Sequence, residues 1–308
     1  MNKIKINWKF TRQKNIQKTK VIVHLSGGLG NQLFQFLKAS QIAKVNCSEI
    51  WLNLNWFELV KYRKPGYQAN LAKRKPEILR FERVKNCKVE VSRFPRDGRF
   101  ERILSYVSSG ILNKFGFISD KAAFGSELKI NRKKIRVIGH HVSNVFPKDW
   151  DINTLLGSVM FEASQGRPDS IGVHVRLDDY LEQKFIFVPT ERYYLSAISE
   201  AQKIMPNSNI FIFTDSLIQL KENYPKLVGK ADKIVSTEDP ISDMLDLSNS
   251  RVLIASNSTY SWWSTQFGPD KLLVIRPSNY FINSARDALE APCWPINALA
   301  LDPTSGNF

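Results

Sequence analysis

The fold is decided by the stretch Val21-Ile-Val-His-Leu-Ser-Gly-Gly-Leu-Gly-Asn-Gln-Leu-Phe-Gln-Phe-Leu-Lys-Ala39. It opens with a short, mainly β-branched apolar run, and from Leu33 onward its apolar residues are spaced for a helix that packs on a sheet. Between these parts, Gly27, Gly28 and Gly30 allow positive φ and let a ligand approach the backbone closely. The stretch therefore predicts a buried strand, a glycine turn and an amphipathic helix.

The glycine turn has two interpretations. Asn31 and Gln32 place side-chain amides at a helix N-terminus, where free N–H groups favour an anion and where amides lower the helix propensity. A turn that serves packing alone has the same spacing, because the sequence fits neither the dinucleotide fingerprint nor the phosphate loop. We treat the glycine loop formed by Gly28, Gly30, Asn31 and Gln32 as a candidate site.

Length and composition indicate a globular protein of two domains. The chain has 308 residues, of which 43% are hydrophobic, enough for a large core and about two domains of ~150 residues. We expect a basic arm over 1–19, a first domain over 20–165 and a second over 166–308, with a C-terminal tail that packs back on the first domain. The three cysteines are far apart in the sequence, which favours a reduced cytoplasmic setting over a disulfide scaffold.

The positive charge is concentrated in the first half of the chain. Residues 1–150 carry 31 Lys or Arg against 10 Asp or Glu, a net charge of +21, whereas residues 151–308 carry 13 against 19, a net of −6. Such a field attracts nucleic acid, an anionic membrane surface or a phosphorylated substrate, and a solvated Lys-rich surface is the alternative. No apolar run is long enough for a signal peptide or a membrane span. We therefore expect a cytoplasmic protein with at most a peripheral contact on the inner face of the membrane.

Polar side chains follow the predicted strands of the second half. Ile171–Tyr180 reads as a strand that ends in charge, with His174 and Arg176 on one face. Burying this pair in a core is costly, so a cleft is favoured, where Arg176 could hold a phosphate with two hydrogen bonds. Asn209–Phe213 is a second buried strand, and Asp215 follows it at the same expected edge.

A polar turn follows the next predicted strand, Arg251–Ala255. The turn runs Ser256-Asn-Ser-Thr-Tyr-Ser-Trp-Trp263 and leads into a helix. Its hydroxyl and N–H groups suit a diphosphate, and ordinary helix capping by Ser258 or Thr259 is the alternative. The pair in Asp149-Trp-Asp151 is similar to a metal-binding motif of sugar transferases, but a helix start explains it equally well.

Four motifs, in this order, resemble those of glycosyltransferase family 11, the α-1,2-fucosyltransferases, which are related more distantly to α-1,6- and protein O-fucosyltransferases. They are Gly27-Gly-Leu-Gly-Asn-Gln-Leu-Phe-Gln35, His174-Val-Arg-Leu-Asp-Asp-Tyr180, Phe213-Thr-Asp215 and Ser256-Asn-Ser-Thr-Tyr-Ser-Trp-Trp263. The resemblance implies an α/β, GT-B-like fold of two Rossmann-type domains with the active site in the cleft between them. It also implies GDP-fucose as the donor, inversion at the anomeric carbon, and neither a metal nor another cofactor.

The same resemblance assigns roles to residues. Arg176 would bind the donor diphosphate and assist its departure, His174 would position the nucleotide, and Asn31 would lie near the reacting centre. The positions that fall where related enzymes contact guanine and phosphates are Asp215, Asp243, Ser258, Thr259 and Tyr260. The family motif commonly has a second arginine where this chain has Leu177. Since alternation points Leu177 away from Arg176, we expect the loss of a supporting contact rather than of catalysis.

The general base and the acceptor stay open. The candidates for the base are Asp178, Asp179, Glu182 and His141, and Asp179 could instead hold the loop. The expected acceptor is O-2 of a galactoside in an oligosaccharide or a surface-glycan precursor, and a precursor linked to a lipid diphosphate is one that the basic half would attract. A donor with another GDP-linked hexose is the first alternative. A nucleic-acid-binding protein is the second, although no recognisable module accompanies the basic residues.

Overall fold

The computed structural model describes residues 19–60, 74–90, 109–119, 132–140, 142, 167–237, 239–284, 287, 294 and 298–307. The basic arm over 1–18, the domain boundary expected at 165–166, His141 and the pair Asp149 and Asp151 lie outside these residues. Within the described residues, no helix has both the length and the apolar character needed to cross a lipid bilayer.

The first domain is built on a parallel five-stranded sheet with the order β3-β2-β1-β5-β4. The predicted strand–turn–helix is confirmed, and the helix α1 begins at Leu29, so that Asn31 and Gln32 lie in its first turn. In chain order the elements are β1 Lys20–His24, α1 Leu29–Val45, β2 Glu49–Asn53, α2 Asn55–Val60, the 3-10 helix η1 Glu77–Arg80, α4 Glu82–Lys85, β3 Lys88–Val89, α6 Ser109–Lys114, β4 Phe117–Ile118 and β5 Lys134–Val137.

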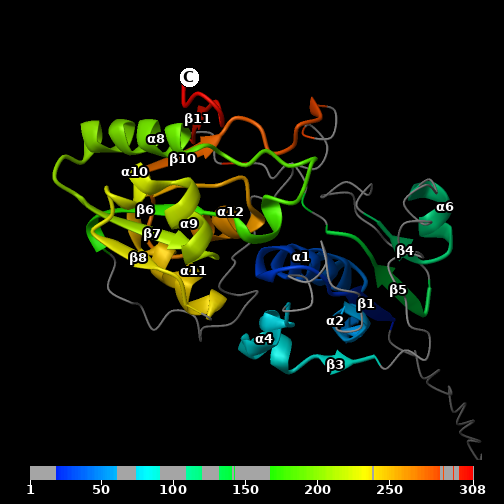
Figure 1. Ribbon diagram of the computed structural model, residues 1–308. Helices are drawn as coiled ribbons and strands as arrows, with labels where there is room; N and C mark the ends of the chain where they lie inside the picture. The colour runs from blue at the N-terminus through cyan, green and yellow to red at the C-terminus, as the bar shows by residue number, and fades with distance from the viewer. Residues whose placement is uncertain are drawn as a thin grey trace, which may run out of the picture.

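The second domain is built on a parallel six-stranded sheet with the order β11-β10-β9-β6-β7-β8. From the central β6 the chain winds outward in one direction through β7 and β8, and β9, β10 and β11 extend the other side (Figure 1). The elements are β6 Arg167–Val175, η3 Asp178–Tyr180, α8 Glu191–Ile204, β7 Asn209–Thr214, α9 Leu217–Asn223, α10 Pro225–Val228, β8 Lys233–Val235, α11 Pro240–Ser248, β9 Ser250–Ile254, α12 Thr259–Gln266, β10 Leu273–Pro277 and β11 Leu299–Leu301. The expected α/β architecture of two Rossmann-type domains is confirmed.

Helices cover both faces of the second sheet, which is why its strands are apolar on both sides. One face of β6 presents Val173 and Val175, which pack with the α8 residues Tyr193 and Ala197. On the opposite face of the sheet, β7 and β9 side chains pack with Leu247 of α11. Because the direction of winding changes between β6 and β9, the carboxyl ends of these strands open a crevice there, as in other doubly wound sheets.

The described part of the C-terminal tail contacts both domains. Its last strand, Leu299–Leu301, pairs in parallel with β10, and Thr190 at the start of α8 donates its hydroxyl to the carbonyl oxygen of Thr304. The described end of the chain, residues 298–307, therefore extends the second sheet, because an open sheet edge offers it a row of backbone partners. Trp294 alone in the described tail packs against side-chain clusters of both domains.

The two domains share one hydrophobic core at the contact between α1 and α12 (Figure 1). Phe34 of α1 lies 4.8 Å from the ring of Trp262 and 5.1 Å from that of Trp263. The indole N–H of Trp263 donates to the carbonyl oxygen of Gly30 at 2.9 Å. A Cβ on Gly30 would meet the Thr259 hydroxyl at 2.6 Å, so the glycine allows the two helices to approach.

We therefore predict that Gly30→Ala destabilises the protein. The new methyl group overpacks the interface, which costs about 1–3 kcal/mol and exceeds the ~1 kcal/mol that alanine gains in helix propensity. Gly229→Ala is the matched control, because a Cβ there has ordinary contacts at 3.5 and 3.7 Å. Urea denaturation monitored by tryptophan fluorescence measures both free energies of unfolding, and equal values for the two variants would contradict the prediction.

Candidate active site

A cavity of about 510 Å³ lies between the two domains, within the range typical of small-molecule sites. The first domain contributes the glycine loop and the segment before η1. The second domain contributes residues at or after the carboxyl ends of β6, β7 and β8, with parts of α11 and α12. The lining residues are Gly28, Leu29, Arg74, Lys75, Glu77, His174, Arg176, Phe213, Thr214, Asp215, Thr237, Pro240, Asp243 and Tyr260.

Arg176 follows β6 directly and places a guanidinium group in this cavity. Its side chain is only 13% exposed, and its Nη1 lies 2.8 Å from a carboxylate oxygen of Asp215. Its Nη2 forms an ion pair with Asp179, and its guanidinium carbon lies 5.3 Å from the ring centre of Tyr180. Burial opposes the charge, but the carboxylates of Asp215 and Asp179 raise the pKa of Arg176 above its usual value. Arg176 is therefore a permanent buried cation.

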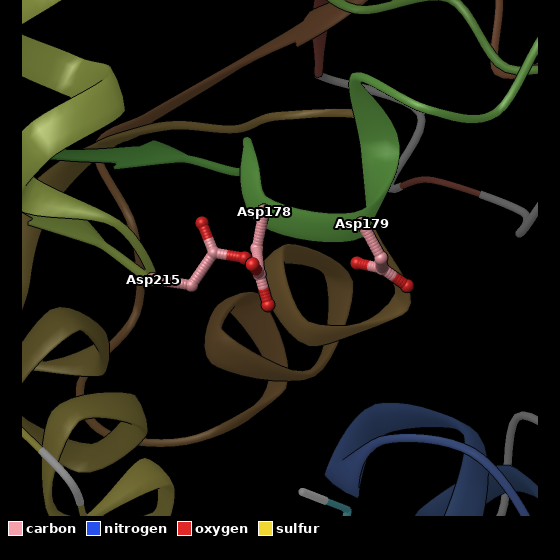
Figure 2. A group of neighbouring side chains, drawn as sticks. All are labelled: Asp178, Asp179 and Asp215. Atoms are coloured by element: carbon pink, nitrogen blue, oxygen red, sulfur yellow. The ribbon is translucent and has the colours of Figure 1, made fainter. Parts of the chain in front are cut away.

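Three aspartates surround this cation. Carboxylate oxygens of Asp178, Asp179 and Asp215 lie within 4.8 Å of one another, and Figure 2 shows the side chains of Asp178 and Asp215 together with that of Asp179 to one side of them. Carboxylates at this spacing could hold a divalent ion. However, Asp179 and Asp215 both form ion pairs with Arg176, so the protein itself supplies a counter-charge.

The environments of the adjacent aspartates differ. Burial alone would raise the pKa of Asp179, but the guanidinium groups of Arg176 and Arg74 lower it below its usual value. Burial and the nearby charge of Asp215 raise the pKa of Asp178. Asp179 is thus bound to cations as a carboxylate, whereas Asp178 is the more basic of the two.

His174 lies near the end of β6 and is buried, with part of its side chain lining the cavity. Its ring stacks on that of Tyr260 at 5.0 Å, and its Nδ1 lies 2.9 Å from the hydroxyl oxygen of Ser256 and 2.6 Å from that of Ser261. Burial, with a smaller contribution from Arg176, lowers the pKa of His174 to about 3. The imidazole is therefore neutral near pH 7 and offers one donor and one acceptor.

The polar turn before α12 is used largely for internal contacts. The Ser258 hydroxyl caps the helix by accepting from the backbone N–H of Tyr260 at 3.2 Å, which was the alternative to phosphate binding. The Thr259 hydroxyl crosses to the first domain and donates to Oδ1 of Asn31 at 2.8 Å. Of the residues expected to contact the donor from this turn, Tyr260 lines the cavity, and its hydroxyl donates to the carbonyl oxygen of Pro240. Asn31, Ser258 and Thr259 are not among the residues that line the cavity.

Gln32 forms hydrogen bonds inside the first domain and does not line the cavity. Its side chain is fully buried, its Nε2 donates to the carbonyl oxygens of Gly27 and Lys75 at 3.0 and 2.8 Å, and its Oε1 accepts from the N–H of Ile78 at 3.1 Å. These bonds join the glycine turn to the segment around η1. These hydrogen bonds explain why an amide occupies this position although it lowers the helix propensity: Gln32 links the glycine turn to the segment around η1.

Asp243 lies in the first turn of α11 and lines the cavity. Its two carboxylate oxygens accept from the backbone N–H and the hydroxyl of Thr237, at 3.1 and 2.7 Å. Each oxygen keeps a lone pair for a further donor. Leu177, by contrast, is fully buried in the core of the second domain, as alternation predicted. Glu182 is exposed and does not line the cavity.

Sequence reasoning missed the contribution of the segment before η1. Arg74, Lys75 and Glu77 line the cavity, and Arg74 reaches Asp179 of the second domain at 3.3 Å. In the sequence Arg74 is one of many basic residues between positions 61 and 102, and no spacing distinguishes it. Only the packing of the two domains brings it to the site.

The sequence profile of Glycosyl transferase family 11 matches residues 149–291, which include the motif residues of the second domain. A protein of Escherichia coli named alpha-1,2-colitosyltransferase is 24% identical over 296 residues, or 89% of this chain and 96% of that protein. The family 11 profile thus matches the second half of the chain, and the relative from Escherichia coli is similar along most of its length. These matches agree with the resemblance that the motifs of the sequence indicate.

Two solved structures are similar to this glycosyltransferase. The fucosyltransferase NodZ from Bradyrhizobium has 14% identity and a TM-score of 0.45, over 80% of this chain and 91% of NodZ. A mutant of FUT1 from Arabidopsis thaliana, in complex with GDP, has 14% identity and a TM-score of 0.46, over 90% of this chain and 75% of FUT1.

The buried His174 predicts a distinctive dependence of stability on pH. Its pKa is about 3 in the folded state against 6.5 in the unfolded state, so below pH 6.5 only the unfolded chain gains the proton. The stabilisation that neutral, buried His174 gives the folded state is therefore present above pH 6.5. It is lost progressively as the pH falls toward 3. Between pH 7 and pH 5 we expect His174→Gln to lose roughly 1–2 kcal/mol less unfolding free energy than the wild type. Urea denaturation at both pH values measures this, and equal losses would contradict it.

Proposed function

We propose that this glycosyltransferase moves L-fucose from GDP-fucose to a hydroxyl group of a galactoside, with inversion at the anomeric carbon and without a metal ion. The observation that carries the proposal is the permanently charged Arg176 in the interdomain cavity, opposite the glycine loop. The name of the relative from Escherichia coli, an alpha-1,2-transferase, supports O-2 as the accepting position. The acceptor belongs to an oligosaccharide or a surface-glycan precursor.

Arg176 would stabilise the leaving group. When the bond between the anomeric carbon and the diphosphate breaks, negative charge develops on the β-phosphate and positive charge on the sugar ring. A fixed guanidinium group in a site with little water stabilises that negative charge without reorganising. Because Asp215 and Asp179 hold Arg176 on two sides, its position is set before the donor arrives.

The new bond forms between the acceptor oxygen and the anomeric carbon, and the acceptor hydroxyl loses its proton. Asp179 is a poor proton acceptor because Arg176 and Arg74 lower its pKa. The carboxylate of Asp178 lies next to that of Asp215, which lines the cavity, and its pKa is raised, so Asp178 is the candidate we favour for the general base. In this scheme Asp179 takes part in catalysis as the partner that positions the guanidinium group of Arg176.

The nucleotide would lie along the second domain. The carboxylate of Asp243 is fixed by Thr237 and keeps acceptor capacity for the N–H groups of guanine. Tyr260, stacked on the neutral His174, provides an aromatic surface on the same wall of the cavity. The hydroxyls of Ser258 and Thr259 would support the turn through the contacts described above.

The donor is tested by a panel of sugar nucleotides. We expect GDP release with GDP-fucose and a β-galactoside, inhibition by GDP but not by ADP, and unchanged rates in the presence of a chelator. The panel also contains other GDP-linked hexoses and an activated colitosyl donor, since the name of the relative favours that sugar as the alternative. Rates that disappear with chelator and return with a divalent ion would overturn the metal-independent mechanism, and preference for another donor would overturn the assignment to fucose.

Arg176→Ala should lower kcat by about 10²- to 10³-fold, the usual cost of removing one group that stabilises developing negative charge. Arg176→Lys should recover part of the rate, because it restores the charge but not the planar fork. Arg192→Ala, exposed on α8, is the control and should be as active as wild type. Comparable turnover in Arg176→Ala and the control would remove the basis of the proposal.

A further inference from the structure

The carboxylate of Asp179 lies between two arginines from different domains. Nη2 of Arg176 forms an ion pair with Oδ1 of Asp179, and Nη2 of Arg74 lies 3.3 Å from the same oxygen. Both guanidinium groups line the interdomain cavity. One carboxylate oxygen cannot accept hydrogen bonds from all the N–H donors of two guanidinium groups. Both arginines therefore keep N–H donors for another anion.

Arg74 in particular keeps guanidinium N–H groups that Asp179 does not engage. Its side chain is 21% exposed, and within the described part of the chain the contact with Asp179 is its one polar interaction at ion-pair distance. Burial and the like charge of Arg176 lower the pKa of Arg74, while Asp179, Asp215 and Asp178 oppose that effect. A half-buried guanidinium group with a single shared carboxylate is a favourable position for a phosphate.

The glycine loop makes room for this guanidinium group. A Cβ on Gly28 would lie 3.1 Å from Nη1 of Arg74, closer than side chains ordinarily approach. Gly28 and Leu29 line the same cavity, so Arg74 lies over the backbone of the turn and next to the space that a ligand would occupy. The absence of a side chain at position 28 therefore serves Arg74 as well as the ligand.

The segment that carries Arg74 is held at both ends. Gln32 binds the carbonyl oxygen of Lys75 and the N–H of Ile78, as described above. At the end of η1, Arg80 forms two hydrogen bonds, at 2.7 and 2.8 Å, with the carboxylate of Asp239 in the second domain. These anchors limit the movement of η1 relative to both domains, so that Arg74 is available without folding of a loop around the ligand.

We propose that Arg74 is a second cation for the diphosphate of the donor, supplied by the first domain, and that Asp179 positions both guanidinium groups for it. Arg74 and Arg176 then approach the diphosphate from opposite domains, while fully buried Leu177 contributes no charge. This inference rests on the proposed function, because it requires a nucleoside diphosphate sugar in the cavity. It adds a residue of the first domain to the donor site.

Titration calorimetry with GDP and with guanosine tests this role. We expect Arg74→Gln to bind GDP about 10- to 100-fold more weakly than wild type and to bind guanosine equally well, because only GDP carries the diphosphate. Arg74→Lys should have intermediate GDP affinity. Lys85→Gln, at an exposed position in α4, is the matched control for loss of one positive charge and should bind GDP like wild type.

The outcomes separate the two proposals. Unchanged GDP affinity in Arg74→Gln, or equal losses for GDP and guanosine, would overturn the role of Arg74 while leaving the donor assignment intact. A wild-type protein that binds no GDP would overturn both. Transfer assays add a second readout, in which Arg74→Gln should lower kcat/KM for GDP-fucose by at least the factor by which it weakens GDP binding.

Discussion

The close contact between the N-terminal turns of α1 and α12 is the constraint on which the rest of the structure depends. At Gly30 the backbone of the first domain approaches Thr259 so closely that no side chain fits, and Trp263 donates a hydrogen bond to the Gly30 carbonyl oxygen. The aromatic side chains around this contact bury apolar surface from both domains in one cluster. The packed contact between α1 and α12 therefore fixes the two domains relative to each other next to the interdomain cavity. The separation of the cavity walls is set by this packing.

Within that cavity, charge is balanced by pairing across the domain boundary. Arg176 is buried between Asp179 and Asp215, and Arg74 approaches Asp179 from the other domain. Removing charges from water is costly unless each finds a partner, so these ion pairs are a condition for placing arginine in the cleft at all. An anionic ligand with two phosphates can compete for the same donors. In the proposed function the carboxylates serve as partners that position the cations.

Several polar residues of the motifs maintain the geometry instead of contacting a ligand. Gln32 clamps the segment before η1, and Thr259 joins α12 to Asn31. The hydroxyls of Ser256 and Ser261 contact Nδ1 of the neutral His174. Each of these side chains is needed at its position because a buried backbone or ring polar group would otherwise lack a partner. A motif residue can therefore support the geometry of the cavity through contacts inside the protein.

The sequence by itself determined the local structure and the second-domain half of the site. The strands before the glycine turn and before Arg176 are continuous apolar runs, and polar groups directly after such strands meet at one sheet edge whatever the details of packing. His174, Arg176 and Asp215 were found in this way, and all three line the cavity. The motif order also pointed to the family that the sequence profile identifies.

Only the tertiary structure decided what the first domain contributes. Arg74 lies in a basic stretch without periodicity, and its approach to Asp179 joins positions that are far apart in the chain. The same holds for the partners of Asp178 and Asp179, which are neighbours in sequence: Asp178 lies next to Asp215, whereas Asp179 lies to one side and contacts Arg176 and Arg74 (Figure 2). It also holds for the tail, which adds to the second sheet. Local sequence encodes periodicity and turn chemistry, whereas the partner of a charged side chain depends on which surfaces the folded domains bring together.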